Sequence, residues 1–217
     1  GCHHDFVVRV GIKNSLALAK AGDPPTVLRV GPGSGSQNQS LDCDPNVSKL
    51  ADELAFGCGP QYVLNPGTTC PGPVPLSCVP IETGQKTNQV PMGLNHRILG
   101  DEKATSCTSP NSWPNYAADD KRILSVFVVP FGAFQNNGGG QVPIQDFAYF
   151  YVTGWTGSGQ GFANPCEGNG DDPVPNNDPA YIVGHFIKYV QTLNNSGGGT
   201  QTCDFNSTSG CVAVLDK

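Results

Sequence analysis

The stretches Ile-Leu-Ser-Val-Phe-Val-Val at 123–129 and Asp-Phe-Ala-Tyr-Phe-Tyr-Val-Thr-Gly-Trp at 146–155 decide the fold class of this chain. The first is apolar at nearly every position and rich in β-branched residues, which predicts a central strand buried on both faces. The glycine-rich link at 136–140 tolerates positive φ, so we expect an antiparallel hairpin with a loose tip. The second stretch alternates like a strand, with one side formed by Phe147, Tyr149, Tyr151, Thr153 and Trp155 and the other by Ala148, Phe150 and Val152.

Three further strands are expected around this hairpin. Short apolar runs predict them at 181–190, 6–10 and 211–215. Residues 121–190 would then form a central antiparallel sheet, and its predicted core includes Phe127, Phe150 and Phe186.

Two helices are predicted in the first half of the chain. The pattern at 45–56 is amphipathic, with Asp44 as a suitable N-cap and Gly57 as the stop signal. A shorter helix is expected at 92–99, ended by Gly100. Nothing after residue 121 has a strong helical period.

These elements predict an α+β fold with an antiparallel β-sheet core, one or two short helices, long loops and several disulfides. The length of 217 residues favours a single secreted domain, 1–217. Its first part, 1–120, would contain loops and helices, and its second part, 121–217, would be mainly β.

Nine cysteines among 28 glycines and 19 prolines predict a disulfide framework formed outside a reducing cytosol. The short spacings favour Cys70–Cys78 and Cys203–Cys211, and the proline-rich segment 65–80 would be ordered by disulfides rather than by regular structure. Spacing does not rank the other pairings, although we expect at least three bridges, with Cys2 as the odd cysteine, free or paired to another chain. The predicted disulfide cysteines are Cys43, Cys58, Cys70, Cys78, Cys107, Cys166, Cys203 and Cys211.

The charge pattern excludes two classes of partner. The net charge is −6, and no cluster of Lys or Arg occurs, so neither nucleic acid nor an anionic lipid surface is an expected partner. No apolar run approaches the ~20 residues that a membrane-spanning helix needs, so no membrane contact by this segment itself is expected.

Several motifs along nearly the whole chain resemble the extracellular C-terminal region of TadE/TadG-like proteins, which are associated with Flp (Tad) pilus assembly in bacteria. They are SQNQSLDCDPN at 36–46, CVPIETG at 78–84, GLNHRILG at 93–100, FAYFYVTGW at 147–155, NPCEGNGDDP at 164–173, GHFIKYV at 184–190 and CVAVL at 211–215.

This resemblance implies a non-enzymatic extracellular domain that presents a disulfide-stabilised surface for assembly or adhesion. Other pilus or cell-envelope proteins would be its partners, and its oligomeric state stays open. Proteins of this kind typically begin with a membrane-spanning pilin-like helix, so the domain would be extracellular or on the cell surface, released from or anchored through a missing N-terminal segment. The Asp-x-Ser-x-Ser metal pattern of some TadG-type proteins does not occur here.

The alternative hypothesis is a secreted hydrolase or a ligand-binding module with a site built from loops. The Gly-x-Ser-x-Gly patterns at 31–35 and 157–161 have no helix after them and are interpreted as linkers, not nucleophile elbows. His185 is expected to be a hydrogen-bonded structural histidine on a strand, and His96 a solvated one on a helix. We therefore predict no catalytic residue and no cofactor.

Two weak metal patterns are also interpreted without a metal. Gly1-Cys2-His3 would bind copper only with a free N-terminal amine, and the oxygen-rich segment 167–178 lacks EF-hand spacing and is interpreted as an acidic surface loop. Bacterial proteins usually leave glycosylation sequons unused, and the sequons here are at Asn38, Asn46, Asn194 and Asn206.

Overall fold

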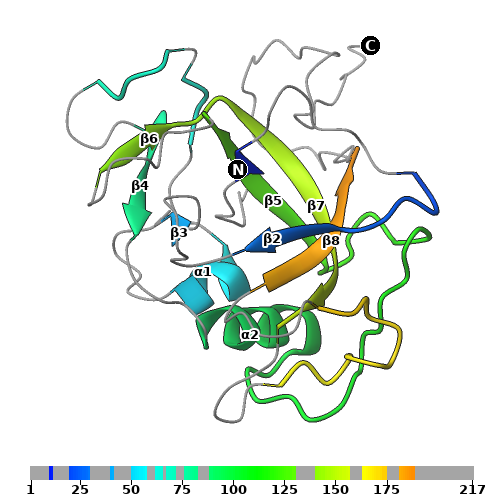
Figure 1. The fold of residues 1–217 in the computed structure, drawn as a ribbon. Helices are drawn as coiled ribbons and strands as arrows, with labels where there is room; N and C mark the ends of the chain where they lie inside the picture. Colours follow the sequence, from blue (N-terminus) through cyan, green and yellow to red (C-terminus); the bar gives the residue numbers. More distant parts are fainter. Residues whose placement is uncertain are drawn as a thin grey trace, which may run out of the picture.

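The computed structural model describes residues 10–11, 20–29, 40–41, 50–57, 62–65, 67–71, 76–82, 88–130, 140–156, 163–174 and 181–188. Figure 1 shows the arrangement of their helices and strands. In chain order the elements are β1 (Val10–Gly11), β2 (Thr26–Arg29), β3 (Ser40–Leu41), α1 (Leu50–Phe56), β4 (Cys78–Glu82), α2 (Gln89–Leu94), the π-helix η1 (Asn95–Leu99), β5 (Ile123–Val129), β6 (Gln141–Pro143), β7 (Asp146–Trp155) and β8 (Tyr181–Ile187).

A five-stranded sheet in the order β1-β5-β7-β8-β2 forms the centre of the fold. All its pairings are antiparallel except β1 with β5, which is parallel. The predicted strands β5 and β7 have the expected bounds, and Ser125 lies opposite Tyr149 in their ladder. The α+β fold with an antiparallel core is thus confirmed.

One face of β7 differs from the predicted alternation. Between Val152 and Gly154 the register with β8 shifts by a β-bulge, which adds one residue to β7. Because the extra residue reverses the side-chain parity, Trp155 joins the core cluster of Phe150 and Val152 instead of the Tyr151 side. The expectation that Trp155 shares a side with Tyr151 was therefore wrong.

A second, three-stranded sheet has the order β3-β4-β6. Its middle strand pairs with β6 through Cys78–Pro80 and with β3 through Ile81 and Glu82. This corrects the expectation that 65–80 has no regular structure, because burial of Val79 at 0% exposure favours a strand even with Pro80 in it.

The two helices pack against each other below the large sheet, as Figure 1 shows. Helix α1 lies inside the predicted range 45–56, whose residues 45–49 are outside the described part of the chain. Helix α2 starts three residues before the predicted position 92, continues as η1, and ends as predicted at Gly100 with φ of 84°. A Cβ on Gly93 would collide with Leu54 and with the backbone of Ala51, so this glycine lets the helices touch.

The hydrophobic core lies between the two helices and one face of the large sheet. Leu54, Leu94, Leu124 and Trp155 are members of the same buried cluster. The predicted core positions are confirmed, with exposures of 1% for Phe127, 0% for Phe150 and 7% for Phe186.

Some predicted elements lie partly or wholly outside the described residues. Of the strand expected at 6–10 only Val10 is described, and the one expected at 211–215 lies outside. Strand β8 ends at Ile187, because the described residue Lys188 is no longer in the strand, so the predicted end at residue 190 was too late. None of the helices in the described ranges is long and apolar enough to cross a membrane.

Candidate functional site

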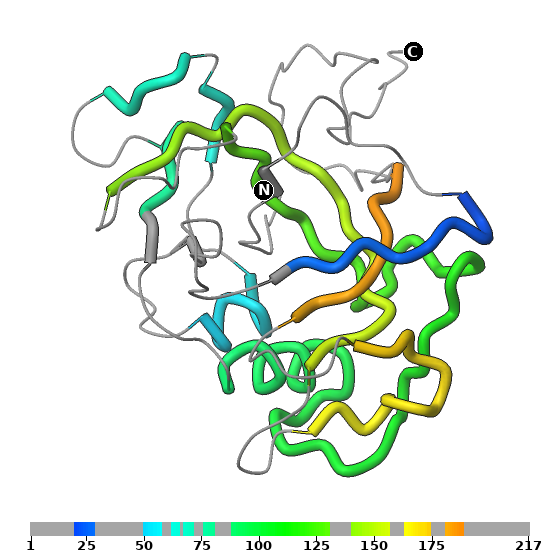
Figure 2. Tube along the Cα trace, viewed as in Figure 1, coloured from blue at the N-terminus to red at the C-terminus, as the bar shows by residue number. Residues whose placement is uncertain are grey.

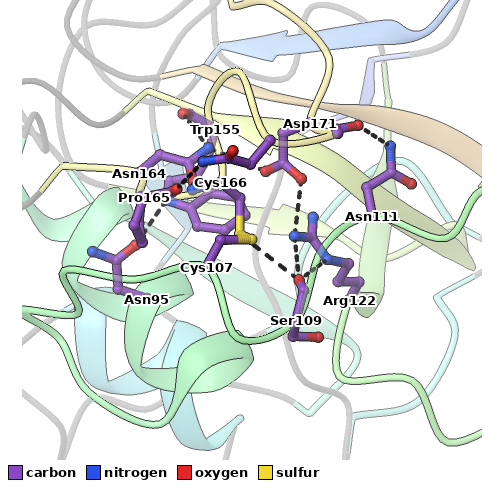
Figure 3. Close-up of a disulfide and its surroundings, with 12 residues drawn as sticks. Asn95, Cys107, Ser109, Asn111, Arg122, Trp155, Asn164, Pro165, Cys166 and Asp171 are labelled. Carbon is purple, nitrogen blue, oxygen red and sulfur yellow. Dashed lines mark hydrogen bonds and ion pairs between the residues drawn. A yellow bond between two sulfur atoms is a disulfide. The ribbon is translucent and has the colours of Figure 1, made fainter.

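Two long loops lie side by side at one end of the large sheet. Figure 2 shows them in green, residues 101–122, and in yellow, residues 163–174. A disulfide between Cys107 and Cys166 joins them, with 4.7 Å between the Cα atoms (Figure 3). Since the first loop enters β5 and the second follows β7, this bridge ties together segments that are 59 residues apart.

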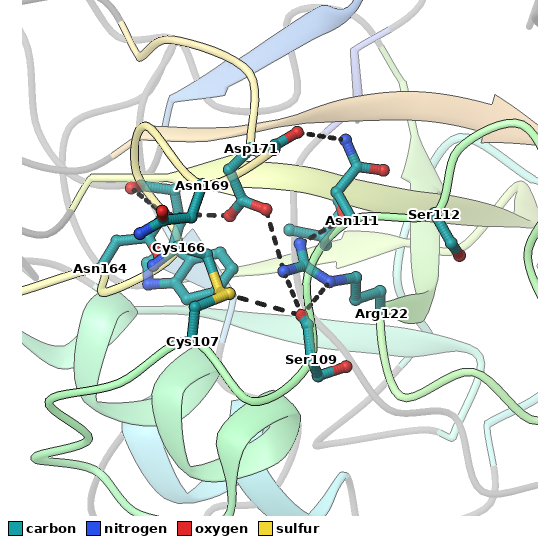
Figure 4. A network of polar contacts seen from close by, with 12 residues as sticks. Cys107, Ser109, Asn111, Ser112, Arg122, Asn164, Cys166, Asn169 and Asp171 are labelled. Carbon is teal, nitrogen blue, oxygen red and sulfur yellow. Dashed lines mark hydrogen bonds and ion pairs between the residues drawn. A yellow bond between two sulfur atoms is a disulfide. The ribbon is translucent and has the colours of Figure 1, made fainter.

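Arg122 crosses from the first loop to the second and is completely buried. Its Nη2 lies 2.9 Å from Asp171 Oδ1 in an ion pair (Figure 4). Its Nε and Nη2 donate to the carbonyl oxygen of Ser109 at 3.1 and 2.7 Å, and its Nη1 donates to that of Val152 at 3.1 Å. The buried guanidinium is thereby compensated by one carboxylate and two backbone carbonyls, as a buried charge must be.

The second loop is held by Asp171 and its neighbours. Asn164 Nδ2 donates to Asp171 Oδ2 at 3.2 Å, and the backbone N–H of Asp172 donates to the carbonyl of Thr153 at 2.8 Å. Asn111, from the first loop, donates to the carbonyl of Gly170 at 3.1 Å. Burial raises the pKa of Asp171, although the positive charge of Arg122 acts in the opposite direction.

Trp155 connects this network to the π-helix η1. The guanidinium of Arg122 lies 5.3 Å from the centre of its ring, a cation–π contact. Its indole Nε1 donates to Asn95 Oδ1 at 3.0 Å. Asn95 is fully buried and in turn donates to the carbonyls of Glu102 and Ala163, at 3.1 and 2.8 Å. One connected set of contacts thus fastens both loops to β7 and to η1.

An aromatic cluster fastens the first loop to the other face of the sheet. Tyr151 and His185 are cross-strand neighbours on β7 and β8. Trp113 stacks on His185 with 4.2 Å between ring centres and 7° between planes, and Tyr116 stacks on Tyr151 at 4.7 Å. Such a cluster beneath a long loop is a satellite core, and it keeps the loop in place.

Three polar side chains at the edge of this cluster contact one another, and Ser112 Oγ donates to Asp120 Oδ2 at 3.5 Å. Tyr151 donates its hydroxyl to Asp120 Oδ2 at 3.0 Å, and its oxygen lies 3.0 Å from Ser112 Oγ. Burial raises the pKa of Tyr151, so the phenol stays protonated at neutral pH. His185 is 3% exposed, burial lowers its pKa, and within the described residues its Nδ1 has no hydrogen-bond partner, so the hydrogen bond expected for a structural histidine is not found at this atom.

A different kind of surface lies beside the second disulfide, Cys70–Cys78, which confirms the predicted pairing. Asn65 donates to Cys78 Sγ at 3.4 Å and to the carbonyl of Thr69 at 3.0 Å. The backbone N–H of Val63 donates to the carbonyl of Leu76 at 2.9 Å, which brings the two segments together. Three apolar side chains are exposed here, and we call them the apolar patch: Val63 at 44%, Leu64 at 47% and Leu76 at 51%.

The other predicted site residues have mixed outcomes. Cys107 and Cys166 are bridged, but their pairing was not predicted, and Cys2, Cys43, Cys58, Cys203 and Cys211 lie outside the described residues. His96 is half-buried rather than solvated, since its ring meets Phe56 edge-on at 4.8 Å.

The metal hypotheses are tested only in part. Among the described residues no group of three or more His, Cys, Asp or Glu could hold a metal ion. The acidic-loop interpretation of 167–178 is wrong for Asp171, which is buried against Arg122, and residues 175–178 lie outside the described part. The sequons, both Gly-x-Ser-x-Gly patterns and Gly1-Cys2-His3 lie outside it too.

Sequence reasoning missed Arg122, Asp171 and Trp113. A signal for Arg122 existed, because an arginine directly before a strand buried on both faces is unusual in a chain with only 14% charged residues. Its partner could not be inferred, since Asp171 stands in a run of acidic and glycine residues 49 positions later. No family model, curated protein or solved structure matches this chain.

Proposed function

We propose that this chain is a non-enzymatic extracellular domain of a surface protein, which presents a disulfide-stabilised surface for assembly or adhesion. The observation that carries this proposal is the apolar patch, in which Val63, Leu64 and Leu76 are each 44–51% exposed beside a disulfide. Grouped exposed apolar side chains on a fixed frame are typical of protein interaction sites.

The way in which the loops at 101–122 and 163–174 are held also supports this proposal. The buried contacts of Arg122 and the Cys107–Cys166 bridge hold loops that have little regular structure of their own. Binding surfaces are commonly loops on a rigid scaffold. Disulfides of this kind persist in oxidising compartments, which fits an extracellular or cell-surface location.

The finer assignment is to a surface protein associated with Tad pilus assembly, with pilus or cell-envelope proteins as partners. It rests on the sequence resemblance described above. Deleting the gene in the source organism should impair pilus display or adhesion while leaving growth intact, and normal pili and adhesion in the deletion strain would contradict this assignment.

The apolar patch offers a matched test of the general proposal. Val63 and Val27 are the same residue type with 44% and 43% exposure, but only Val63 belongs to the patch. Val63→Ser should weaken retention of the purified domain on cell envelopes, whereas Val27→Ser should not, and both should keep the parental melting temperature. Equal retention of both variants and the parent would refute a role for the patch.

The enzyme alternative is tested by turnover. We expect no hydrolysis of generic esterase, glycosidase, peptidase and phosphatase substrates by the purified domain. Turnover that disappears on His185→Phe, or on replacing one carboxylate, would favour a secreted hydrolase instead.

A further inference from the structure

The turn between Cys166 and Asp171 contains the dipeptide Asn169-Gly170. The backbone N–H groups of Asn169 and Asp171 both donate to the carbonyl of Cys166, at 2.8 and 3.4 Å. Gly168 and Gly170 have φ of 76° and 105°, values that only glycine adopts without strain. The turn is therefore tight, and its two ends are fixed by a disulfide and by a buried ion pair.

The reacting groups of this dipeptide are accessible. Asn169 and Gly170 are both exposed. Within the described part of the chain, the backbone N–H of Gly170 has no hydrogen-bond acceptor. The amide of Asn169 makes one exposed hydrogen bond, from Nδ2 to the carbonyl of Pro165 at 3.2 Å, which is a weak restraint. Gly170 has no Cβ to obstruct an approach to its nitrogen.

We propose that Asn169 is a site of spontaneous modification, where its side chain cyclises onto the nitrogen of Gly170 and then opens mainly to isoaspartate. In the first step the Gly170 amide loses its proton to solvent hydroxide, its nitrogen bonds to Cγ of Asn169, and ammonia leaves. Water then opens the five-membered imide at either carbonyl. The overall reaction consumes one water molecule and releases one ammonia molecule, and no oxidant or reductant takes part.

Two other asparagines of these loops are protected by their surroundings. Asn164 is followed by Pro165, which has no N–H to act as a nucleophile. Asn111 uses its amide in hydrogen bonds to Gly170 and Trp113, and the next N–H, that of Ser112, donates to Tyr151. Of Asn111, Asn164 and Asn169, the last is therefore the reactive one.

The modification would loosen the join between the two loops. Isoaspartate adds one carbon to the main chain between Cys166 and Asp171, and it replaces a neutral amide by a carboxylate. Both ends of this turn are anchored, so the added length must displace either the hydrogen bonds to the Cys166 carbonyl or Asp171 itself. Loss of the Asp171 contact would leave the buried charge of Arg122 without its counter-ion.

The experiment is an ageing time course of the full chain in mildly alkaline buffer at physiological temperature. Peptide mapping by mass spectrometry should show conversion of amide to acid at Asn169, and isoaspartyl methyltransferase should label the same peptide. The aged protein should melt about 2–4 °C lower than fresh protein. Asn137-Gly138, the other Asn-Gly pair in the sequence, serves as the internal reference for reactivity.

Two variants distinguish whether the longer main chain or the added charge lowers the melting temperature. Asn169→Gln keeps an amide but cyclises far more slowly, so its melting temperature should hold on ageing. Asn169→Asp adds the charge without lengthening the main chain, and it should melt above the aged parent. The proposal is overturned if Asn169 stays intact while Asn137 converts, if conversion leaves the melting temperature unchanged, or if Asn169→Gln loses stability as the parent does.

Discussion

The two disulfides of the described residues lie in very different surroundings. Cys70–Cys78 closes a local segment, with a separation of 8 residues, and its neighbours Leu64 and Leu76 are exposed and apolar. Cys107–Cys166 joins residues 59 apart and lies beside the buried Arg122–Asp171 ion pair. The local bridge thus orders a surface, while the long-range bridge fastens two loops to the sheet.

This difference predicts a difference in stability. In the chain-entropy description a bridge restricts the unfolded chain more when it closes a longer loop. The long-range bridge also has a buried polar network beside it, which an opened loop would leave without partners. The loops at 101–122 and 163–174 should therefore contribute more to the free energy of unfolding than the segment around the apolar patch.

The largest effect is expected for Arg122→Ala. This change leaves Asp171 as an unpaired buried charge and removes the donors to Ser109 and Val152, so the free energy of unfolding should fall by about 3–5 kcal/mol. Urea unfolding measures the loss, and Lys121→Ala, at the exposed neighbouring residue, is the control. If Arg122→Ala lowered the free energy of unfolding by less than removal of the Cys70–Cys78 bridge does, the two loops would not be the more stabilising region.

Removing the long-range bridge should have the next largest effect. Replacing Cys107 and Cys166 by Ala should lower the free energy of unfolding by roughly 4 kcal/mol for a separation of 59 residues. Limited proteolysis should then cut within 101–122 or 163–174 before the sheet is degraded. Unchanged stability in urea would show that the polar network alone holds these loops.

Removing the local bridge should cost less. Replacing Cys70 and Cys78 by Ala should lower the free energy of unfolding by roughly 2.6 kcal/mol for a separation of 8 residues. Cys78 and Cys166 are both 0% exposed, so each double variant loses one buried sulfur, and the difference reports loop length together with the polar network beside the long-range bridge. Equal losses in the two double variants would contradict this account.

The smallest effect is a pH dependence at the aromatic cluster. Burial lowers the pKa of His185 below 6.5 in the folded chain, while the charges of Asp172 and Asp23 oppose the shift. The unfolded chain therefore binds more protons below pH 6.5, so this contribution to stability is complete above that pH and is lost as the pH falls through the folded pKa.

The measurement is the difference in unfolding free energy between the parent and His185→Phe across this pH range. We expect the advantage of the parent to decrease on acidification. Asp171 acts with the opposite sign, because its folded pKa is raised above 3.8, and the difference between the two proteins cancels that contribution. A difference that does not vary with pH would refute the assignment to His185.

The sheet could be predicted because its information is local. In β5, and in β7 as far as Val152, the apolar pattern of neighbouring residues predicts the strand, whereas the bulge that changes the side of Trp155 leaves no local signal. The local bridge Cys70–Cys78 follows from short spacing in the same way. The α2 boundary was harder, since Gly93 is unfavourable in a helix interior and only its contact with α1 explains its presence.

The loop network could not be predicted because its partners are distant and chemically unremarkable in sequence. Nothing near Cys107 points to Cys166, and nothing in the acidic run distinguishes Asp171 from Asp172. The stacking of Trp113 on His185 likewise joins a loop to a strand that lies 72 residues later. Such pairs are chosen by the tertiary fold, so the sequence identifies the residue types but not the pairings.

The β-bulge in β7 has a consequence for how this chain can change in length. The extra residue between Val152 and Trp155 is what places the indole on the same side of the sheet as Val152. Deleting one residue there would remove the bulge and leave Trp155 two positions after Val152, which in a regular strand is again the same side, toward Asn95. The sheet should therefore tolerate a one-residue deletion at this point, whereas a deletion elsewhere in β7 would turn the side chains beyond it to the opposite side.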